Sequence, residues 1–290
     1  MALDDPYGEL SGGAWLRGNL HAHTTNSDGA RPTQQVIDDY AARGYEFLMI
    51  SDHDIYTSAE DLGKFEDRGM VLVPGNEVSA NGPHMLHVHA DGFVEPSAER
   101  QAVIDAIDAG RGFSVFNHPN WQQEFDHCPF AVLEHCTGYT GLEIYNGVIG
   151  LQAGSPYATN KWDMLLSAGR KVWGFAHDDS HAEGDVELGW NCAYVTDRSA
   201  EGVAAALQAG RFYASTGVTI EAIEVSGMHI RIATKDARRV VALADYGRRI
   251  AVADATEIEV AVPDDMRYVR FECWGDGERS AWTQPLFLAR

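Results

Sequence analysis

The stretch Gly18-Asn-Leu-His-Ala-His-Thr-Thr-Asn-Ser-Asp-Gly29 ends a short apolar run and begins a polar turn. Residues two apart in an extended strand point to the same side, so His21 and His23 would present two imidazoles to one metal ion. Asp28 adds a carboxylate from the turn, and Gly29 allows the bend that returns it. A His-x-His pair also occurs in ordinary half-buried strands, so the rest of the chain decides between the two interpretations.

The composition is that of an ordinary globular protein, with 45% hydrophobic and 22% charged residues among 290. This length favours one large domain with a smaller second one. The net charge of −21 argues against a nucleic acid polymer or an anionic membrane as partner, because both are polyanions that need lysine and arginine. Residues 1–7 lack the basic and apolar parts of a signal peptide, and no later run has 18 apolar residues, so we expect a cytoplasmic location.

The first two thirds of the chain alternate between apolar strands that end in polar tips and segments with helical spacing. Strands are expected at 15–20, 47–50, 70–73, 113–116 and 171–176. Helices are expected at 31–43, 98–109, 129–135, 157–168 and 199–209. This order is typical of βα units around a parallel sheet or barrel, in which the active site lies at the carboxyl ends of the strands.

The pattern changes after residue 219, where short alternating segments are separated by Gly, Asp or Pro turns. These segments cover 220–225, 230–232, 240–243, 258–262, 268–273 and 286–288. We therefore predict an α/β domain over 1–215 that carries the chemistry and a small β-sandwich-like domain over 216–290. The second domain is a possible surface for homo-oligomer formation.

Histidines and carboxylates gather at the predicted strand ends. The candidate metal ligands are His21, His23, Asp28, His53, Glu77, one or more of His84, His87 and His89, then His118, Asp179 and His181. They are too many for one ion, and imidazoles with carboxylates and no thiolate suit Mn, Zn or Fe, so we expect two or three divalent ions bridged by Glu77. Such a site generates hydroxide from a bound water and holds both oxygens of a displacement, which is hydrolytic chemistry.

Other polar residues lie near these predicted strand ends, and their roles are open to more than one interpretation. Asp54 and Asp178 could orient imidazoles or transfer protons, or be solvated loop carboxylates. Arg17 is the candidate for contacting a phosphate, or else forms a surface ion pair. Residues that could shape the pocket are Asn120, Trp121, Glu143, Tyr145 and Asn146. The histidines taken as ordinary surface or core residues are His127, His135 and His177.

The four cysteines lack Cys-x-x-Cys spacing, and buried free thiols are the expected state. An alternative is a zinc site built from His127, Cys128, His135 and Cys136, although this separation fits no common zinc finger.

Taken together, the motifs resemble, in order, those of the PHP (polymerase and histidinol phosphatase) superfamily. The matching residues are His21-Ala-His23, Asp28, Ser51-Asp52-His53-Asp54, Gly75-Asn76-Glu77, Asn117-His118-Pro119 and Asp179-Ser180-His181. The resemblance implies a distorted (β/α)7 barrel, a cluster of two or three ions, and hydrolysis of phosphate esters. It places ligands at His21, His23, Asp28, His53, Glu77, His118, Asp179, His181 and one histidine of the 84–89 stretch, where the family context favours His87.

Two finer resemblances point to different esters. Asp28 in place of a third histidine, with the Asp52-His53-Asp54 tip, resembles the amidohydrolase-like PHP phosphoesterases. The runs 210–217 and 281–285 resemble a branch that includes carbaryl-type ester hydrolases. We therefore expect a phosphoesterase in which metal-bound hydroxide attacks a small-molecule phosphate ester. The alternatives are a carboxyl or carbamate ester hydrolase with the same cluster, and a non-catalytic, metal-stabilised binding protein.

Overall fold

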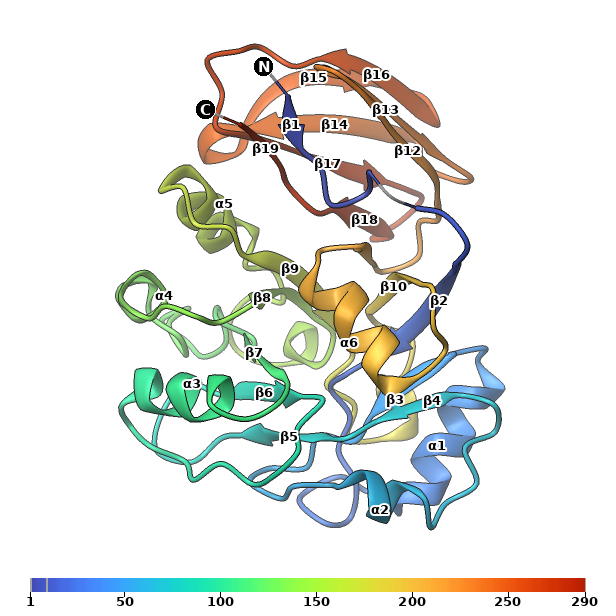
Figure 1. Cartoon of the computed structure of the whole chain (residues 1–290), viewed down its shortest axis with the longest axis vertical. Helices are drawn as coiled ribbons and strands as arrows, with labels where there is room; N and C mark the ends of the chain where they lie inside the picture. Colours follow the sequence, from blue (N-terminus) through green and yellow to red (C-terminus); the bar gives the residue numbers. More distant parts are fainter. Residues whose placement is uncertain (1, 9, 290) are drawn as a thin grey trace.

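The computed structural model describes residues 2–8 and 10–289 of a mixed α/β protein (Figure 1). The elements of its first part are β1 (Leu3–Asp4), β2 (Ala14–Asn19), α1 (Thr33–Ala42), β3 (Phe47–Met49), α2 (Ala59–Leu62), β4 (Val71–Val73), β5 (Gly75–Val78), β6 (Met85–Val88), α3 (Arg100–Asp108), β7 (Phe113–Phe116), α4 (Phe130–His135), β8 (Gly141–Asn146), η1 (Val148–Leu151), α5 (Thr159–Ser167), β9 (Trp173–His177), η2 (Glu183–Asp185), β10 (Trp190–Val195), α6 (Ala200–Gln208) and β11 (Phe212–Ser215).

The last part of the chain is almost entirely β-structure and lies at the top of Figure 1. Its elements are β12 (Ile220–Ser226), β13 (His229–Thr234), β14 (Arg239–Ala244), η3 (Asp245–Gly247), β15 (Arg248–Ala253), β16 (Glu257–Ala261), β17 (Tyr268–Trp274), β18 (Ser280–Thr283) and β19 (Leu286–Leu288). The change to a β-rich tail expected from the sequence is therefore present.

The five helices expected from apolar spacing are α1, α3, α4, α5 and α6, each within two residues of its predicted bounds. In α3, for example, Val103, Ile104 and Ile107 lie on one face and are fully buried against the apolar side chains of β6 and β7. The elements that apolar spacing did not indicate are β1, α2, β5, β6, β8, β10, β11, β15, β18 and the short helices η1, η2 and η3.

Two sheets carry the strand ends on which the candidate ligands lie. One has the order β5-β6-β7-β8-β9, and the other contains the run β10-β2-β3-β4. Isolated bridges between His53 and Glu77 and between Ala22 and Ser180 join the edges of the two sheets. Across the described residues the backbone pairing forms separate sheets, and no closed barrel is found.

The site-bearing sheets are mixed, whereas the alternation of strands and helices in the sequence predicts a parallel sheet or barrel. β5 and β6 are antiparallel, as are β6 and β7, and β10 runs antiparallel to β2. The chain between β5 and β6 spans only residues 79–84. A parallel connection needs a crossover of a dozen or more residues, so this short segment permits only a hairpin-like return.

The C-terminal strands share hydrogen bonds with the site-bearing strands. β18 pairs with β11, and β11 pairs with β10, so the larger sheet runs without a break from the tail to β2. Gln284 adds a second link, because its amide accepts from the Gly174 N–H and donates to the Gly174 C=O in β9. The division into domains at residues 215 and 216 remains a prediction. Among the described residues, no helix combines the length and the apolar character needed to cross a membrane.

A buried ion pair also fastens the tail to helix α5. The Arg270 guanidinium in β17 donates to both oxygens of Asp163 at 2.7 Å, and Tyr268 donates to the same carboxylate. Arg270 and Asp163 are both buried. Removing one partner of a buried pair leaves the other charge without compensation, which costs far more than losing a surface pair.

We predict that Arg270→Met lowers the free energy of unfolding by about 3–5 kcal/mol, because the Asp163 carboxylate stays buried without its cation. The matched control is Arg239→Met, which removes an exposed pair with Asp254 and is expected to leave the free energy of unfolding nearly unchanged. Urea unfolding followed by circular dichroism measures both values. Equal losses in the two variants would contradict the proposed role of the buried pair.

Candidate metal site

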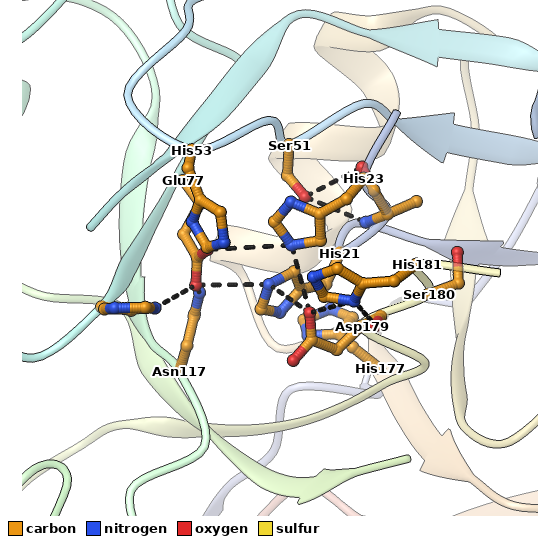
Figure 2. Close-up of polar contacts among 12 residues, drawn as sticks. His21, His23, Ser51, His53, Glu77, Asn117, His177, Asp179, Ser180 and His181 are labelled. Carbon is orange, nitrogen blue, oxygen red and sulfur yellow. Dashed lines mark hydrogen bonds and ion pairs between the residues drawn. The ribbon is translucent and has the colours of Figure 1, made fainter. Parts of the chain in front are cut away.

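The floor of the candidate site is a set of fully or nearly fully buried side chains. His21 and His23 follow β2, Glu77 lies in β5, and Asp179 follows β9 (Figure 2). The His21 Nε2 atom lies 3.3 Å from Glu77 Oε1 and 3.1 Å from Asp179 Oδ1, and His23 Nε2 lies 3.1 Å from the same Asp179 oxygen. His118 joins from the end of β7, with its Nε2 at 3.5 Å from Glu77 Oε1. Separate strands thus bring nitrogen and oxygen ligands together.

The rim of the site is more exposed and consists of Asp28, His53 and His181. His53 Nδ1 lies 2.6 Å from Glu77 Oε2, while its Nε2 lies 3.5 Å from Asp28 Oδ2. His181 Nε2 lies 3.4 Å from the other Asp28 oxygen. The Asp28 side chain is 54% exposed, so this carboxylate stands between the buried floor and solvent.

The structure brings His84, and not His87, to the cluster. His84 Nδ1 lies 3.3 Å from Glu77 Oε1, whereas His87 Nε2 lies 3.0 Å from the carbonyl oxygen of Arg111. The cause is the register: Glu77 stands opposite Leu86, so His87 points to the other face of the sheet with its partner Asn76. His89, the third candidate, lies near Glu201, with its Nε2 3.6 Å from Glu201 Oε1.

The buried carboxylate of Glu143 in β8 orients several of these groups. Its Oε1 lies 2.7 Å from His21 Nδ1 and 2.9 Å from His177 Nδ1, and its Oε2 accepts from the backbone N–H of His118 at 2.6 Å. Asn146 donates to the same Oε2 at 2.8 Å. Because an ionised carboxylate only accepts, the His21 Nδ1 atom carries a proton, and Nε2 is the nitrogen that faces Glu77 and Asp179 and would bind a metal ion.

Two residues of the site have backbone conformations that are unusual without glycine. His118 has a φ of 28° and Asp179 a φ of 58°. Such conformations cost of order 1–3 kcal/mol and persist only where the surroundings hold them. The Glu143 carboxylate holds the His118 N–H, and Asp179 lies against His21 and His23, so both strained residues are fixed by neighbours in the cluster.

The charges in the cluster are strongly coupled. Burial opposes ionisation of Glu77, but the neighbouring His21 and His84 charges outweigh it and hold the Glu77 pKa well below its usual value. The pKa of Asp179 is lowered in the same way by His21 and His23 against its burial. The pKa of His21 is raised well above its usual value, because Asp179, Glu77 and Glu143 outweigh burial. These carboxylates are ionised at neutral pH, and their field attracts cations.

The donor set fits divalent metal ions. Several buried ring nitrogens make no hydrogen bond to any described residue, namely His21 Nε2, His23 Nδ1, His84 Nδ1 and His118 Nδ1. Groups of possible ligands lie within reach of one ion, including His21 with Glu77 and His118, His21 with His23 and Asp179, and His23 with Asp28, His53 and His181. Imidazole nitrogens and carboxylate oxygens without thiolates are the ligands of Zn, Mn and Fe.

The structure does not bring Asp54, Asp178 or Arg17 into this cluster. The Asp54 carboxylate accepts from the backbone N–H groups of Ser79 and Ala80. Asp178 accepts from the Tyr40 hydroxyl and from the N–H groups of Leu188 and Gly189, and its burial raises its pKa to about 7.

The Arg17 guanidinium stacks on the Tyr45 and Trp190 rings and donates to Glu187 at 3.1 Å, away from the ligands. Neither the adjacency of Asp54 and Asp178 to a candidate ligand nor the position of Arg17 just before His21 set the direction of these side chains.

Three further residues contribute to the site in ways that sequence reasoning left out. His177, taken as an ordinary histidine, shares the Glu143 carboxylate, and Asn117 donates its side-chain amide to Glu77 Oε1. His127 lies against His118 and accepts from the His84 N–H at 3.0 Å. The role of Glu143 could have been inferred from the sequence. Glu143 is the one carboxylate in the apolar run 141–144, and a buried carboxylate needs a hydrogen-bonding partner.

The alternative zinc site receives no support from the geometry. His127 faces His84 and His118, while Cys128 and Cys136 are free and buried in the hydrophobic core. Burial raises the pKa of the Cys128 thiol to about 12, so the thiolate that a metal requires is disfavoured.

A small pocket of about 140 Å³ opens above the cluster. Its lining consists of Asp28, His53, His84, His118, Trp121, Val148, Ile149, Gln152, Asp179 and His181. The volume is below the roughly 300–1,000 Å³ of sites that enclose a whole drug-sized ligand. It can therefore enclose only a small chemical group beside the candidate ligands. Of the residues proposed to shape the pocket, Trp121 lines it directly, whereas Asn120 donates to the Tyr157 carbonyl and the Asn160 side chain.

Parts of the chain are similar to two phosphoesterases. It is 35% identical over 95 residues to a 3',5'-nucleoside bisphosphate phosphatase of Chromobacterium violaceum, a match that covers 32% of this chain and 33% of that protein. It is 43% identical over 65 residues to a phosphoribosyl 1,2-cyclic phosphate 1,2-diphosphodiesterase of Eggerthella lenta, which covers 21% of this chain and 24% of that protein. The chain thus spans a third or less of the length of these relatives. No protein-family model matches it.

The whole fold is similar to a solved structure. A two-domain protein from Bacteroides vulgatus, described as containing a predicted PHP-like metal-dependent phosphoesterase, aligns with a TM-score of 0.57 at 15% identity. The alignment covers 98% of this chain and 89% of that one, so the likeness of fold extends beyond the site-bearing strands into the β-rich tail.

We predict that Glu143→Gln weakens binding of Mn and Zn about 10- to 100-fold, because the amide cannot accept from His21, His177 and the His118 backbone together. Titration calorimetry with each metal alone measures the affinity, and circular dichroism checks the fold. Glu124→Gln is the control, since it removes the same charge from an exposed loop. An affinity that is the same in both variants would show that Glu143 does not orient the ligands.

Proposed function

We propose that this chain, which belongs to the PHP superfamily, hydrolyses a small-molecule phosphate ester with two or three bound divalent ions. The observation that carries the proposal is the convergence of imidazoles and carboxylates from separate strands around Glu77, beneath a small pocket. The names of the similar proteins support the phosphate ester as the bond that is cleaved.

Glu77 is the residue that we expect to connect the ions. Its Oε1 faces His21, His84 and His118, and its Oε2 faces His53 at 2.6 Å. Each oxygen of one buried carboxylate therefore looks toward a different set of imidazoles. This division favours a bridging role and explains how a compact site holds more than one ion.

The residues proposed to hold the ions are His21, His23, Asp28, His53, Glu77, His84, His118, Asp179 and His181. When bound, divalent ions of this kind lower the pKa of a coordinated water to near neutral and stabilise the charge of the leaving oxygen. The protein itself contributes a dry floor, since His21, His23 and Glu77 have no exposed surface. It also keeps the imidazoles in one orientation through Glu143.

The rim residues are those in reach of an ester in the pocket. Asp28, His53 and His181 all line the pocket and are partly exposed. The His181 Nδ1 atom lies 2.8 Å from the Asp179 carbonyl oxygen and can only donate to it, so Nε2 is the nitrogen that faces Asp28. On the pocket side, Nε2 would bind a metal ion.

The architecture belongs to the same proposal. The bridges between His53 and Glu77 and between Ala22 and Ser180 support a distorted (β/α)7 barrel made from the two site-bearing sheets. The strands beyond residue 215 would then form the second, β-rich domain over 216–290, attached through β18 and β11.

We predict that His53→Ala and Asp179→Asn each lower kcat/KM for p-nitrophenyl phosphate by more than about 100-fold, because several kcal/mol of charge stabilisation depend on the ions that they hold. The matched controls are His229→Ala and Asp264→Asn, which change exposed residues of the C-terminal part and are expected to leave activity intact. Full activity of the His53 and Asp179 variants would contradict the site.

The same assay distinguishes a phosphoesterase from an enzyme that hydrolyses carboxyl or carbamate esters. With Mn or Zn added, bis(p-nitrophenyl) phosphate and p-nitrophenyl acetate are tested beside the monoester. Cleavage of the acetate alone would replace the phosphatase with a carboxyl or carbamate ester hydrolase. No cleavage of any substrate would favour a metal-stabilised binding protein.

We predict two or three metal ions per chain in protein purified without chelator, since the ligands are too many for one ion. Elemental analysis by inductively coupled plasma mass spectrometry measures the number. Dialysis against EDTA should remove both the ions and the activity, and added Mn or Zn should restore the activity. Fewer than two ions per chain would rule out the multinuclear site.

A further inference from the structure

The pocket above the cluster has two walls of different chemistry. The candidate ligands form one wall, and Trp121, Val148, Ile149 and Gln152 form the other. Val148 and Ile149 are buried, and the Trp121 ring packs against His118 with a centroid distance of 5.1 Å. A substrate whose ester lies at the ligands therefore places its remaining atoms against an aromatic and aliphatic surface.

The apolar wall is held rigidly by the rest of the protein. Lys161 donates all three of its N–H bonds to backbone carbonyls of the loop that carries Trp121, at Pro119, Phe125 and Cys128. The loop is also joined to the segment after η1, because Gln122 N–H donates to the Ala153 carbonyl at 2.9 Å. The wall is thus a preformed surface, which lowers the entropic cost of binding a matching group.

The lining of the pocket, as described, contains no arginine or lysine side chain. Nearby cations are committed elsewhere: Lys161 binds the three carbonyls, and Arg100 donates to the carbonyls of Pro83, Ser97, Ser79 and Ala80. A second anionic group on the organic part of the substrate, held away from the ligands, would find no arginine or lysine in this lining and would lie in a protein of net charge −21. Removing such a group from water without a partner of opposite charge is unfavourable.

Two exposed apolar side chains belong to the segments that carry this wall. Leu151 is 78% exposed in η1, which also holds Val148 and Ile149, and Phe125 is 52% exposed in the loop that holds Trp121. Exposed apolar side chains on these segments favour contact with an organic group over contact with a charged one.

We infer that the substrate is a phosphomonoester whose organic part is uncharged and has an aromatic or apolar face that lies on Trp121, Val148 and Ile149. This inference rests on the proposed phosphatase function and names the substrate class of that site. It differs from the doubly phosphorylated nucleoside in the name of the Chromobacterium violaceum relative.

The test compares three phosphates of primary alcohols, so that the leaving groups are matched: benzyl, 4-carboxybenzyl and ethyl phosphate, each with the Mn-loaded or Zn-loaded enzyme. We expect kcat/KM for benzyl phosphate to exceed that for each of the other two by about tenfold or more, since one lacks the apolar face and the other carries a second anion. Trp121→Ala should lower the ratio of kcat/KM for benzyl phosphate to kcat/KM for ethyl phosphate about tenfold.

Gln152→Arg places a cation on the wall. It should lower the ratio of kcat/KM for benzyl phosphate to kcat/KM for 4-carboxybenzyl phosphate about tenfold. Gln123→Arg adds the same charge to an exposed position outside the pocket lining and should leave this ratio of kcat/KM values unchanged. Circular dichroism melting confirms that each variant is folded.

Equal hydrolysis of benzyl and 4-carboxybenzyl phosphate by the unaltered enzyme would overturn the substrate class while leaving the phosphatase function intact. The same conclusion would follow if Gln152→Arg and Gln123→Arg had identical effects. If none of the three phosphates is cleaved with either metal, the proposed function itself fails and the substrate class falls with it.

Discussion

The Glu143 carboxylate is the contact on which the arrangement of the site depends. Buried in β8, it accepts from imidazoles that follow β2 and end β9 and from the backbone N–H that follows β7. It therefore fixes the relative positions of three strand ends that are far apart in the sequence. It also sets which His21 nitrogen carries the proton, and it holds His118 in a backbone conformation that only its surroundings make tolerable. Two of the candidate ligands around Glu77, His21 and His118, are thus positioned by this one unexposed acceptor.

Much of the candidate site could be predicted because it follows local rules. The alternation of His21 and His23 and the position of Asp179 after an apolar strand both place side chains by the geometry of a single strand. The error at His87 has a non-local origin: the antiparallel register of β5 and β6 puts Leu86 opposite Glu77 and turns His87 to the outer face. The short 79–84 connection that forces this pairing contains His84, which reaches the ligands from outside the strand.

Asp54, Asp178 and Arg17 lie outside the cluster because other contacts hold their side chains. Asp54 and Asp178 accept backbone N–H groups, and the Arg17 side chain packs between two aromatic rings. Backbone N–H groups that are removed from water need hydrogen-bond acceptors. A carboxylate that accepts from them is then not available for catalysis. Which donors lie close depends on loops such as 187–189, whose path no local sequence pattern defines. The apolar helices and the β-rich tail, in contrast, were predicted because burial imposes a periodicity that is visible in the sequence.

The pairing of β2 with β10 has a consequence for the newly made chain. The strand that leads into His21 and His23 takes its antiparallel partner from residues synthesised long after it, and the bridge from Ala22 to Ser180 is formed equally late. Contacts between such distant segments slow folding. During translation, the first two histidines therefore emerge well before Asp179 and the β10 strand. A metal ion held by the complete set of candidate ligands would therefore be taken up late, on the ribosome or after release.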